Sequence, residues 1–326
     1  MNTARSIEST FKRESKLAIG TVQFGLPYGV SNRKGQPGKD EVERILSFAK
    51  DIGISLLDTA PAYGQSENVL GDVLGTDSAF QIVTKTCALR GESGKADAVS
   101  AVRRTFEVSL SRLRRDRLYG LIVHLAEDLL GPLGDDIWRV LEKFKSDQNV
   151  EKIGTSCYSG DNLREIIRRY PLDLVQLPFN VFDQKLMHGG LLDELKKSGV
   201  EIHARSVFLQ GLALMDPDKL PDGFKSAQAP LKAFRQLAKS ADLSPLELAL
   251  RFVSSLDSID RLVIGVTDME ELRQIASAVS GDIPKSLDMD SLATGNEAIT
   301  NPSLWPPDNQ QSWAFDFSLN ESGPES

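Results

Sequence analysis

Four polar residues stand at or just beyond the ends of predicted strands, and their types suit proton transfer: Asp58, Tyr63, Lys85 and His124. Asp58 follows a short apolar run, and Tyr63 lies on the loop after it. Lys85 lies near the end of the next apolar strand, and His124 closes the one after that. Parallel α/β proteins keep their chemistry at the carboxyl ends of strands and on the loops that follow. We therefore expect these side chains to share one site.

The four side chains make chemical sense as one acid–base group. A tyrosine hydroxyl has an ordinary pKa of about 10, and a nearby lysine ammonium favours the phenolate and lowers that pKa. Asp58 can pair with Lys85 and hold it in place, and a neutral His124 can orient a substrate carbonyl. Tyr63 would then donate a proton to an oxygen that becomes an alkoxide as hydride arrives.

Each of the four also has an ordinary structural interpretation when it is taken alone. Asp58 could cap a loop, Tyr63 could be a surface tyrosine, Lys85 a solvated lysine and His124 a core histidine. For each residue alone the structural interpretation is favoured. Their joint occurrence at successive strand ends, in this order, favours catalysis instead.

The elements that must position these residues alternate along the chain. Apolar strands are predicted at residues 16–25, 54–57, 80–86, 118–124, 152–156, 172–177, 200–206 and 261–265. A helix is predicted at 39–51, and a second begins after Ser66, which is its expected N-cap. Further helices are predicted at 96–113, 137–147, 161–169, 185–198, 230–241, 245–255 and 269–278. No strand alternates strictly, which indicates burial on both faces. The pattern favours a (β/α)8 TIM barrel. The alternative, a doubly wound sheet, lacks a G-x-G-x-x-G fingerprint after its first strand.

Composition excludes several classes of protein. The chain has 326 residues, 40% of them hydrophobic, and a net charge of −8 without a basic stripe, so we expect no nucleic-acid partner. No apolar run is long enough to span a membrane, and the polar N-terminus predicts a cytoplasmic protein. Two cysteines and three histidines are too few for a metal site. We expect one barrel domain at 16–281, between an N-terminal extension, 1–15, and a partly disordered C-terminal segment, 282–326.

The motifs around the four residues resemble those of the aldo-keto reductases, bacterial-type members in particular. The matching pieces run in order along residues 16–279: Gly20-Thr21, Leu57-Asp58-Thr59-Ala60 with Tyr63-Gly64, Glu67 with Leu70-Gly71, Val83-Thr84-Lys85 and Leu121-Ile122-Val123-His124. The resemblance implies a (β/α)8 barrel in which these Asp, Tyr, Lys and His residues are catalytic. It also implies an NADP(H) or NAD(H) cofactor and an aldehyde, ketone or sugar as substrate.

The same resemblance implies a set of cofactor-binding residues: Gly20, Thr21, Ser156, Gln176, Arg205, Ser206, Phe208, Gln210, Gly211, Gly265, Thr267, Glu271 and Gln274. Two positions depart from the family pattern. Cys157 replaces the asparagine that helps to hold the carboxamide, and a thiol lacks an amide's two-way hydrogen bonding. Arg205 replaces an aromatic residue beside the nicotinamide, where a planar guanidinium can also stack.

The segment after the last predicted strand departs further from the family pattern. Glu271 occupies the position where NADPH-preferring members usually carry arginine, and Asp268 and Glu270 add negative charge beside it. Arg273 lies two places beyond. A site that selects the 2′-phosphate normally supplies Lys or Arg. We therefore expect weak discrimination between the two cofactors, or a preference for NADH.

A rival interpretation is a cofactor-binding regulatory or partner-docking subunit with little turnover. Such barrels keep the four catalytic residues, although this chain shows no long partner-binding extension besides its acidic tail. Trp305 and Trp313 are expected to anchor the C-terminal segment to the barrel. The sequence leaves open the carbonyl substrate, the direction of the reaction and the oligomeric state.

Overall fold

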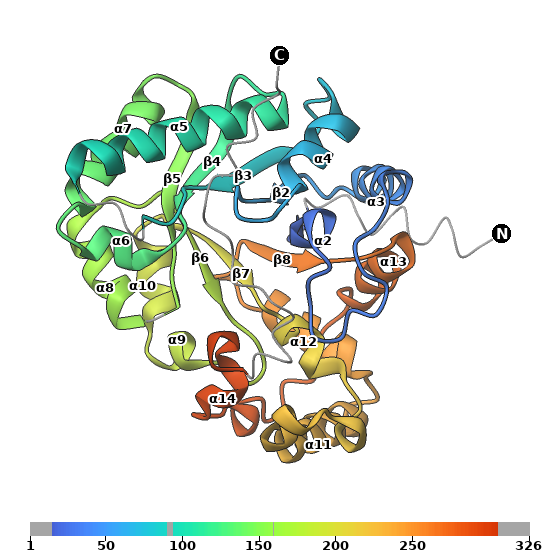
Figure 1. The fold of residues 1–326 in the computed structure, drawn as a ribbon. Coiled ribbons are helices and arrows are strands. Elements are labelled where there is room, and N and C mark those ends of the chain that lie inside the picture. The colour runs from blue at the N-terminus through green and yellow to red at the C-terminus, as the bar shows by residue number, and fades with distance from the viewer. Residues whose placement is uncertain (1–14, 90–93, 159, 306–326) are drawn as a thin grey trace.

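Eight parallel strands close into a barrel in the order in which they occur in the chain. The computed structural model describes residues 15–89, 94–158 and 160–305. Neighbouring strands pair from β1 to β8, and β8 pairs back with β1. This confirms the predicted (β/α)8 fold (Figure 1). The strands are β1 Leu17–Gly20, β2 Leu56–Asp58, β3 Gln81–Lys85, β4 Leu118–Val123, β5 Val150–Ser156, β6 Leu174–Pro178, β7 Glu201–Arg205 and β8 Arg261–Gly265.

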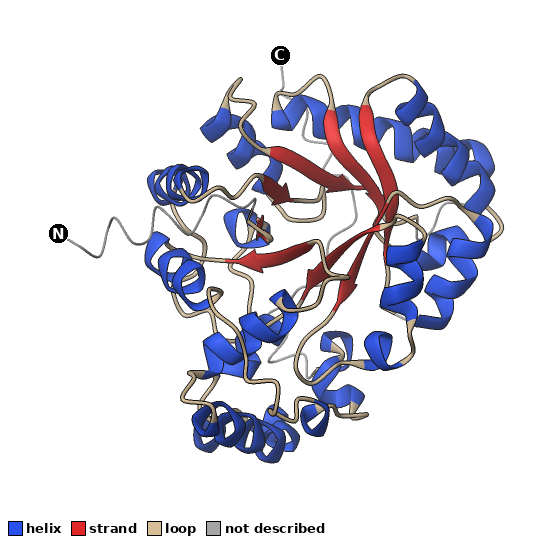
Figure 2. Cartoon of the chain, turned by 180° about the vertical axis from the view of Figure 1, so that it is seen from behind, coloured by secondary structure: helices blue, strands red, loops and turns tan. Residues whose placement is uncertain are grey.

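Helices surround the strands on all sides, as both cartoons show (Figures 1 and 2). The α-helices are α2 Val22–Gly25, α3 Lys39–Asp51, α4 Ser66–Leu74, α5 Lys95–Leu113, α6 Ala126–Leu130, α7 Gly134–Ser146, α8 Gly160–Arg169, α9 Lys185–His188, α10 Leu191–Lys197, α11 Gln228–Ser240, α12 Pro245–Ser254, α13 Met269–Ala278 and α14 Glu297–Thr300. Short 3₁₀ turns are η1 Leu209–Leu214, η2 Pro217–Lys219, η3 Asp222–Ala227, η4 Asp290–Leu292 and η5 Pro302–Leu304.

The barrel has two apolar cores because each strand is covered on both faces. A small inner core fills the barrel with Ala18, Leu56, Val83, Ile122 and Leu174, all fully buried. A much larger outer core lies between the strands and the helices. This double burial explains why no strand sequence alternates between apolar and polar residues.

Helix α12 shows how local sequence sets an element's start. Ser244 is its N-cap and accepts a hydrogen bond from the Glu247 backbone N–H, while the Glu247 carboxylate accepts one from the Ser244 N–H. Pro245 occupies the first helical position, where its missing N–H costs nothing. The helix then buries Leu248, Phe252 and Val253 on one face.

Two predicted details near the first strand are wrong. Residues 22–25 form the short helix α2 and not the end of the strand, and Gly25 passes close to the loop that follows β2. Ser66 is the first residue inside α4 and not its N-cap, which is Gln65. The Ser66 hydroxyl is buried and donates to the carbonyl oxygen of Thr21 at 2.8 Å. Its hydrogen bond therefore joins α4 to the end of β1.

The predicted helix at 185–198 is two helices, α9 and α10. The break falls at Gly190, whose φ of +70° lies in the left-handed region. Residues 126–130 and 210–228 lie outside the elements predicted from sequence. The first form α6, and the second contain three 3₁₀ turns. Short turns of this kind carry too little periodicity to be found from sequence.

The end of the described chain packs on the barrel, as predicted for Trp305. Its side chain is 3% exposed and meets the Phe224 ring edge-on, with centroids 5.0 Å apart. Trp313 lies outside the described residues.

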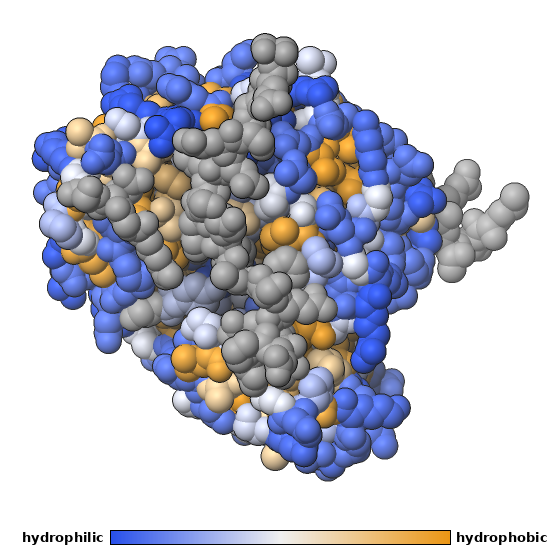
Figure 3. Space-filling model, viewed as in Figure 1, coloured by the Kyte–Doolittle hydropathy of each residue, from blue (hydrophilic) through white to orange (hydrophobic). Residues whose placement is uncertain are grey.

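The outer helices present mostly hydrophilic residues in the space-filling view (Figure 3). Of the part described, no helix has the length and apolar character needed to cross a membrane.

Candidate active site

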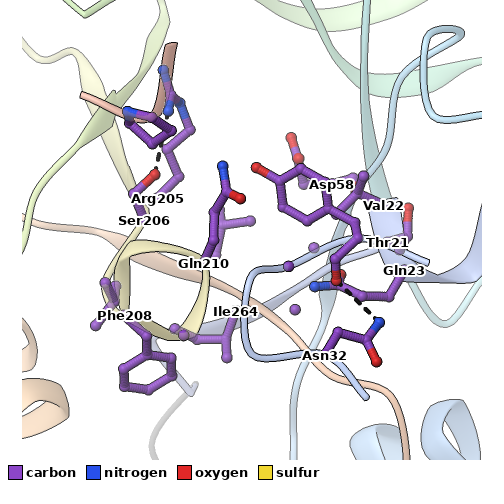
Figure 4. A pocket seen from close by; sticks show the side chains of 18 of the residues that line it. Thr21, Val22, Gln23, Asn32, Asp58, Arg205, Ser206, Phe208, Gln210 and Ile264 are labelled. Carbon is purple, nitrogen blue, oxygen red and sulfur yellow. Dashed lines mark hydrogen bonds between the residues drawn. The ribbon is translucent and has the colours of Figure 1, made fainter. Parts of the chain in front are cut away.

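A cavity of about 780 Å³ lies at the carboxyl ends of the strands, and every predicted catalytic and cofactor-binding residue lines it. The sequence prediction therefore brought together residues that the fold also brings together. In the close-up, Arg205 and Ser206 lie on one side, Thr21, Gln23 and Asp58 lie on the other, and Gln210 lies between them (Figure 4). The cavity runs from the four catalytic candidates to Glu271 and Gln274.

Asp58 and Lys85 form a buried ion pair at the centre of the site. The Lys85 Nζ donates to both Asp58 carboxylate oxygens, at 2.8 and 2.9 Å, and to the Thr59 carbonyl oxygen at 2.9 Å. These three acceptors match the three hydrogens of an ammonium. Gln176 also donates to Asp58, at 2.7 Å from its Nε2. The pair is thus held rigidly, as predicted.

Two glycines place the loop that carries Tyr63. A Cβ atom on Gly25 would lie 1.8 Å from the Tyr63 carbonyl oxygen, and one on Gly64 would lie 2.6 Å from the Gly25 carbonyl oxygen. Gly64 also has a φ of +57°, which favours glycine. Only glycine at both positions lets the two backbones approach so closely. The sequence motif Tyr63-Gly64 therefore has a direct steric reason.

A buried cluster of hydroxyl groups connects this loop to the end of β1. The Thr21 Oγ1 donates to the Asp58 carbonyl oxygen at 2.9 Å and lies 2.7 Å from the Ser66 Oγ. Thr59 lies on the other side, with its Oγ1 3.1 Å from the same Ser66 oxygen. The cluster ties the ends of β1 and β2 to the start of α4.

Tyr63, Lys85 and His124 lie close together at the mouth. The Lys85 Nζ is 4.9 Å from the centre of the Tyr63 ring, and the His124 ring stands edge-on to that ring with centroids 6.1 Å apart. Burial lowers the pKa of His124 well below its ordinary value, and the charges of Lys85 and Arg205 act in the same direction. The imidazole is therefore neutral near pH 7, as predicted.

The expected lowering of the tyrosine pKa by Lys85 is wrong for this arrangement. Burial raises the pKa of Tyr63 well above its ordinary value, the Asp58 charge raises it further, and Arg205 opposes the rise. The lysine charge is already balanced by Asp58 at hydrogen-bonding distance. Tyr63 therefore carries its proton throughout the neutral range.

The loop after β7 has the strained backbone that often marks a functional site. Ser206, Leu209 and Gln210 have φ values of +60°, +49° and +54°, and Gly211 follows at +96°. A Cβ on Gly211 would lie 1.8 Å from the Ser31 Oγ, so this loop packs against the loop after α2. The two loops meet beside the cavity, which both of them line.

The residues present fit an NAD(H) or NADP(H) molecule. The cavity is within the usual size of a ligand pocket and is lined by all the predicted cofactor residues. Ser156 and Gln176 lie near its catalytic end. Cys157, in contrast, is 1% exposed in the outer core, so the family's asparagine contact has no replacement from that side chain. Arg205 stacks on Tyr158, with its guanidinium carbon 3.9 Å from the ring centre.

The far end of the cavity holds charges of both signs. Glu271 accepts hydrogen bonds from the Thr267 N–H and hydroxyl, each at 2.8 Å. Lys34 forms an ion pair with Asp268 and lies 3.3 Å from a Glu271 oxygen. Arg273 instead pairs with Glu270 at 3.0 Å and does not line the cavity.

Sequence reasoning missed several lining residues: Gln23, Tyr28, Asn32, Arg33, Lys34, Tyr158, Pro302 and Ser303. Half of them, Tyr28, Asn32, Arg33 and Lys34, lie in the loop after α2, which matched no motif. The tyrosine of the Ser156-Cys157-Tyr158 run and the basic pair before Gly35 were the signals available. Neither has a spacing that predicts its place in three dimensions.

A (β/α)8 barrel whose mouth holds a buried Asp–Lys pair, a tyrosine and a histidine beside a cavity of about 780 Å³ is the arrangement expected of a carbonyl oxidoreductase. The chain also matches the family model of the aldo/keto reductases over residues 16–290. It belongs to the aldo/keto reductase family. It is a nicotinamide-dependent enzyme that moves a hydride between NAD(H) or NADP(H) and a carbonyl compound.

Known relatives agree with this assignment. The chain is 24% identical over 271 residues to the NADH-specific methylglyoxal reductase of Escherichia coli (strain K12), covering 73% of this chain and 82% of that protein. It is 26% identical over 309 residues to a D-threo-aldose 1-dehydrogenase of a Pseudomonas species, covering 83% and 92%. A solved aldo-keto reductase of Bacillus halodurans, in its holo form, shares the fold with a TM-score of 0.70 at 20% identity, covering 86% and 93%.

Proposed function

We propose that Tyr63 is the general acid of carbonyl reduction, that His124 orients the carbonyl oxygen and that Asp58 and Lys85 fix the geometry. The observation that carries this proposal is the convergence of the four side chains on one part of the cavity. A raised tyrosine pKa suits a proton donor that must keep its proton near pH 7. In the direction of reduction, the carbonyl compound is the substrate and the alcohol is the product.

The cofactor would lie along the rest of the cavity. Ser156 and Gln176 would bind the carboxamide end, the loop of Ser206, Gln210 and Gly211 would cover the middle, and Glu271 would lie at the adenosine end. When bound, the reduced nicotinamide supplies the hydride. The residues of this chain orient the carbonyl, exclude water and deliver the proton.

The cofactor preference is part of the proposal: the protein discriminates weakly between NADH and NADPH, or favours NADH. Glu271 lines the cavity and Arg273 does not. Arg273, the arginine of the segment after β8, forms an ion pair with Glu270 instead. Lys34 reaches the same end but is neutralised by Asp268 and Glu271. A relative at 24% identity is named an NADH-specific reductase, which agrees with this direction.

We also propose that the protein acts in the cytoplasm on small carbonyl compounds, as one barrel domain of residues 16–281 with flanking segments. Its net charge of −8 supports the absence of nucleic-acid partners. Pro302 and Ser303 line the cavity, so the C-terminal segment also shapes the substrate site.

Fluorescence titration with NADH and NADPH, followed by a panel of aldehydes, ketones and sugars, tests the proposal. We expect NADH to bind no more than a few fold more weakly than NADPH and at least one carbonyl to be reduced catalytically. Hundredfold tighter binding of NADPH (about 3 kcal/mol) would contradict the cofactor preference. Tight cofactor binding without turnover of any carbonyl would favour the regulatory-subunit alternative.

A further inference from the structure

Arg205 is a cation at the catalytic end of the cavity that the proton-transfer scheme does not use. It closes β7 and lines the same cavity as Asp58, Tyr63 and His124. Burial lowers the pKa of His124 and of Lys85, and the charge of Arg205 acts in the same direction. The same charge opposes the rise that burial causes in the pKa of Tyr63. The guanidinium therefore acts electrostatically on the whole catalytic end.

The contacts of Arg205 leave its charge unbalanced. Within residues 15–89, 94–158 and 160–305, it forms no ion pair with a carboxylate. Its guanidinium stacks on the ring of Tyr158 and its Nη1 lies 3.4 Å from the Ser206 Oγ. Asp58, which lines the same end, is already paired with Lys85.

The net charge of the catalytic end is therefore positive. The Asp58–Lys85 pair is neutral as a unit, His124 carries no charge near pH 7, and Arg205 adds one positive charge. A partly buried charge without a partner is unfavourable, and a bound anion would relieve it. An anionic ligand thus gains more at this end of the cavity than a neutral one.

The geometry of a stacked arginine favours a planar anion. Stacking uses a face of the guanidinium, here covered by Tyr158, whereas its N–H donors lie in its plane. A carboxylate has two oxygens that match this fork, and such pairs are short, charge-assisted hydrogen bonds. The exposed Tyr158 ring, 55% accessible, leaves the mouth open for a substrate to enter beside it.

We propose that the preferred substrates are oxo acids, whose carboxylate is bound by Arg205 while their carbonyl lies against Tyr63 and His124. This inference rests on the proposed function and specifies its substrate class. The carboxylate takes no part in the chemistry. It contributes binding energy and orients the carbonyl, as remote substrate groups do in enzymes.

Matched pairs of substrates test the inference with the wild-type protein. The pairs are 4-oxobutanoate with its methyl ester and 4-formylbenzoate with its methyl ester, each reduced at saturating NADH. We expect kcat/KM to be at least tenfold higher for the acid in at least one pair. The advantage should shrink as salt is raised, because screening weakens the interaction between the charges. Esters reduced as well as, or better than, the acids in both pairs would overturn the inference.

Variants of Arg205 separate substrate recognition from cofactor binding. The readout is the change in the acid-to-ester ratio of kcat/KM between variant and wild type, in which losses on the cofactor side and intrinsic aldehyde reactivity cancel. We expect Arg205→Gln to lower this ratio at least tenfold (about 1.4 kcal/mol) and Arg205→Lys to retain part of it. Arg139→Gln, an exposed arginine on α7 paired with Asp136, is the matched control and should leave the ratio unchanged.

The outcomes distinguish this inference from the proposed function. A ratio in Arg205→Gln within twofold of wild type would overturn the role of Arg205. Turnover of esters without any preference for acids would leave the proposed function standing and reject only the substrate class. If neither acids, esters nor the carbonyl panel are turned over, both proposals fall together. A preference for phosphorylated aldehydes over both carboxylates would show that the anion is a phosphate and reject the oxo acids.

Discussion

At the scale of single residues, the buried Asp58–Lys85 ion pair lies at the centre of the proposed catalytic group. Its atoms are almost fully buried and its hydrogen bonds are short. Such a pair is weak evidence for stability, but removing one partner leaves a buried charge uncompensated. The pair therefore fixes the site and makes it sensitive to substitution.

Lys85→Met should destabilise the protein by about 3–5 kcal/mol, because the Asp58 carboxylate would lose its countercharge in the interior. The double variant Asp58→Asn with Lys85→Met should regain most of that loss, as measured by urea denaturation. Lys50→Met is the matched control, since the Lys50–Asp77 pair is exposed on the surface and contributes little to stability. Equal effects for the buried and exposed lysines would contradict this account.

The pKa directions give a second prediction for single residues. The pKa of Tyr63 is raised, so the phenol stays protonated below about pH 10, and the pKa of His124 is lowered, so the imidazole stays neutral above about pH 6.5. An ultraviolet difference titration of wild type against Tyr63→Phe should therefore show no phenolate below about pH 10. A phenolate signal near pH 8 would restore the expectation that Lys85 lowers the pKa of Tyr63.

The positions of the predicted catalytic residues and the neutral state of His124 could be predicted from sequence, whereas the direction of the shift in the pKa of Tyr63 could not. Asp58, Tyr63, Lys85 and His124 are marked by motifs at successive strand ends. The pKa of Tyr63 depends on how deeply its loop is buried, which is set by close packing against Gly25. Packing of that kind leaves no pattern in a single sequence.

At the scale of elements, the strands and long helices follow from apolar periodicity, and the loops around the site do not. Lys34 meets Asp268 across 234 positions of the chain, an ion pair that no local signal announces. Ser66 has the sequence of an N-cap, yet its hydroxyl is used to join α4 to β1. Contacts between distant segments therefore override local preference where the site is built.

Gly211→Ala should weaken NADH binding at least fivefold, because the added methyl would collide with Ser31 and push apart the two loops beside the cavity. Gly35→Ala is the matched control. Gly35 also has a positive φ, of +75°, but a Cβ there meets no atom within 4 Å. Both variants should lose some stability to backbone strain, roughly 1–2 kcal/mol, but Gly35→Ala should keep its affinity for NADH. Equal dissociation constants in the two variants would argue against contact between the loops as a determinant of binding.

At the scale of the whole molecule, a polar cluster joins three strands of the barrel away from the catalytic end. Glu201 accepts hydrogen bonds from the Tyr119 hydroxyl at 2.6 Å and from Lys152, and its other oxygen lies 2.7 Å from the His203 Nε2. Burial opposes ionisation of Glu201, but the hydrogen bonds from His203, Lys152 and Tyr119 outweigh it and lower the pKa of that carboxyl. The cluster links β4, β5 and β7.

Glu201→Gln should lower the free energy of unfolding by about 1–3 kcal/mol near neutral pH, because charge-assisted hydrogen bonds are lost. The folded-state pKa of Glu201 is depressed, so its contribution is complete above the unfolded value of about 4.3 and is lost as pH falls further. The difference between wild type and variant should thus shrink below about pH 4. Glu151→Gln, on the exposed side of β5, is the control and should change stability little at any pH. A difference that grows on acidification would contradict the sign.

The central claim is that Tyr63 delivers the proton to the carbonyl oxygen, and Tyr63→Phe tests it most directly. The variant should reduce a carbonyl at least about a hundredfold more slowly than wild type, since a positioned acid contributes roughly 10²–10⁴-fold. Its dissociation constant for NADH, measured by fluorescence in the same preparation, should stay within about twofold, because the hydroxyl serves the chemical step and not cofactor binding. A turnover rate within tenfold of wild type, with NADH binding unchanged, would contradict the claim.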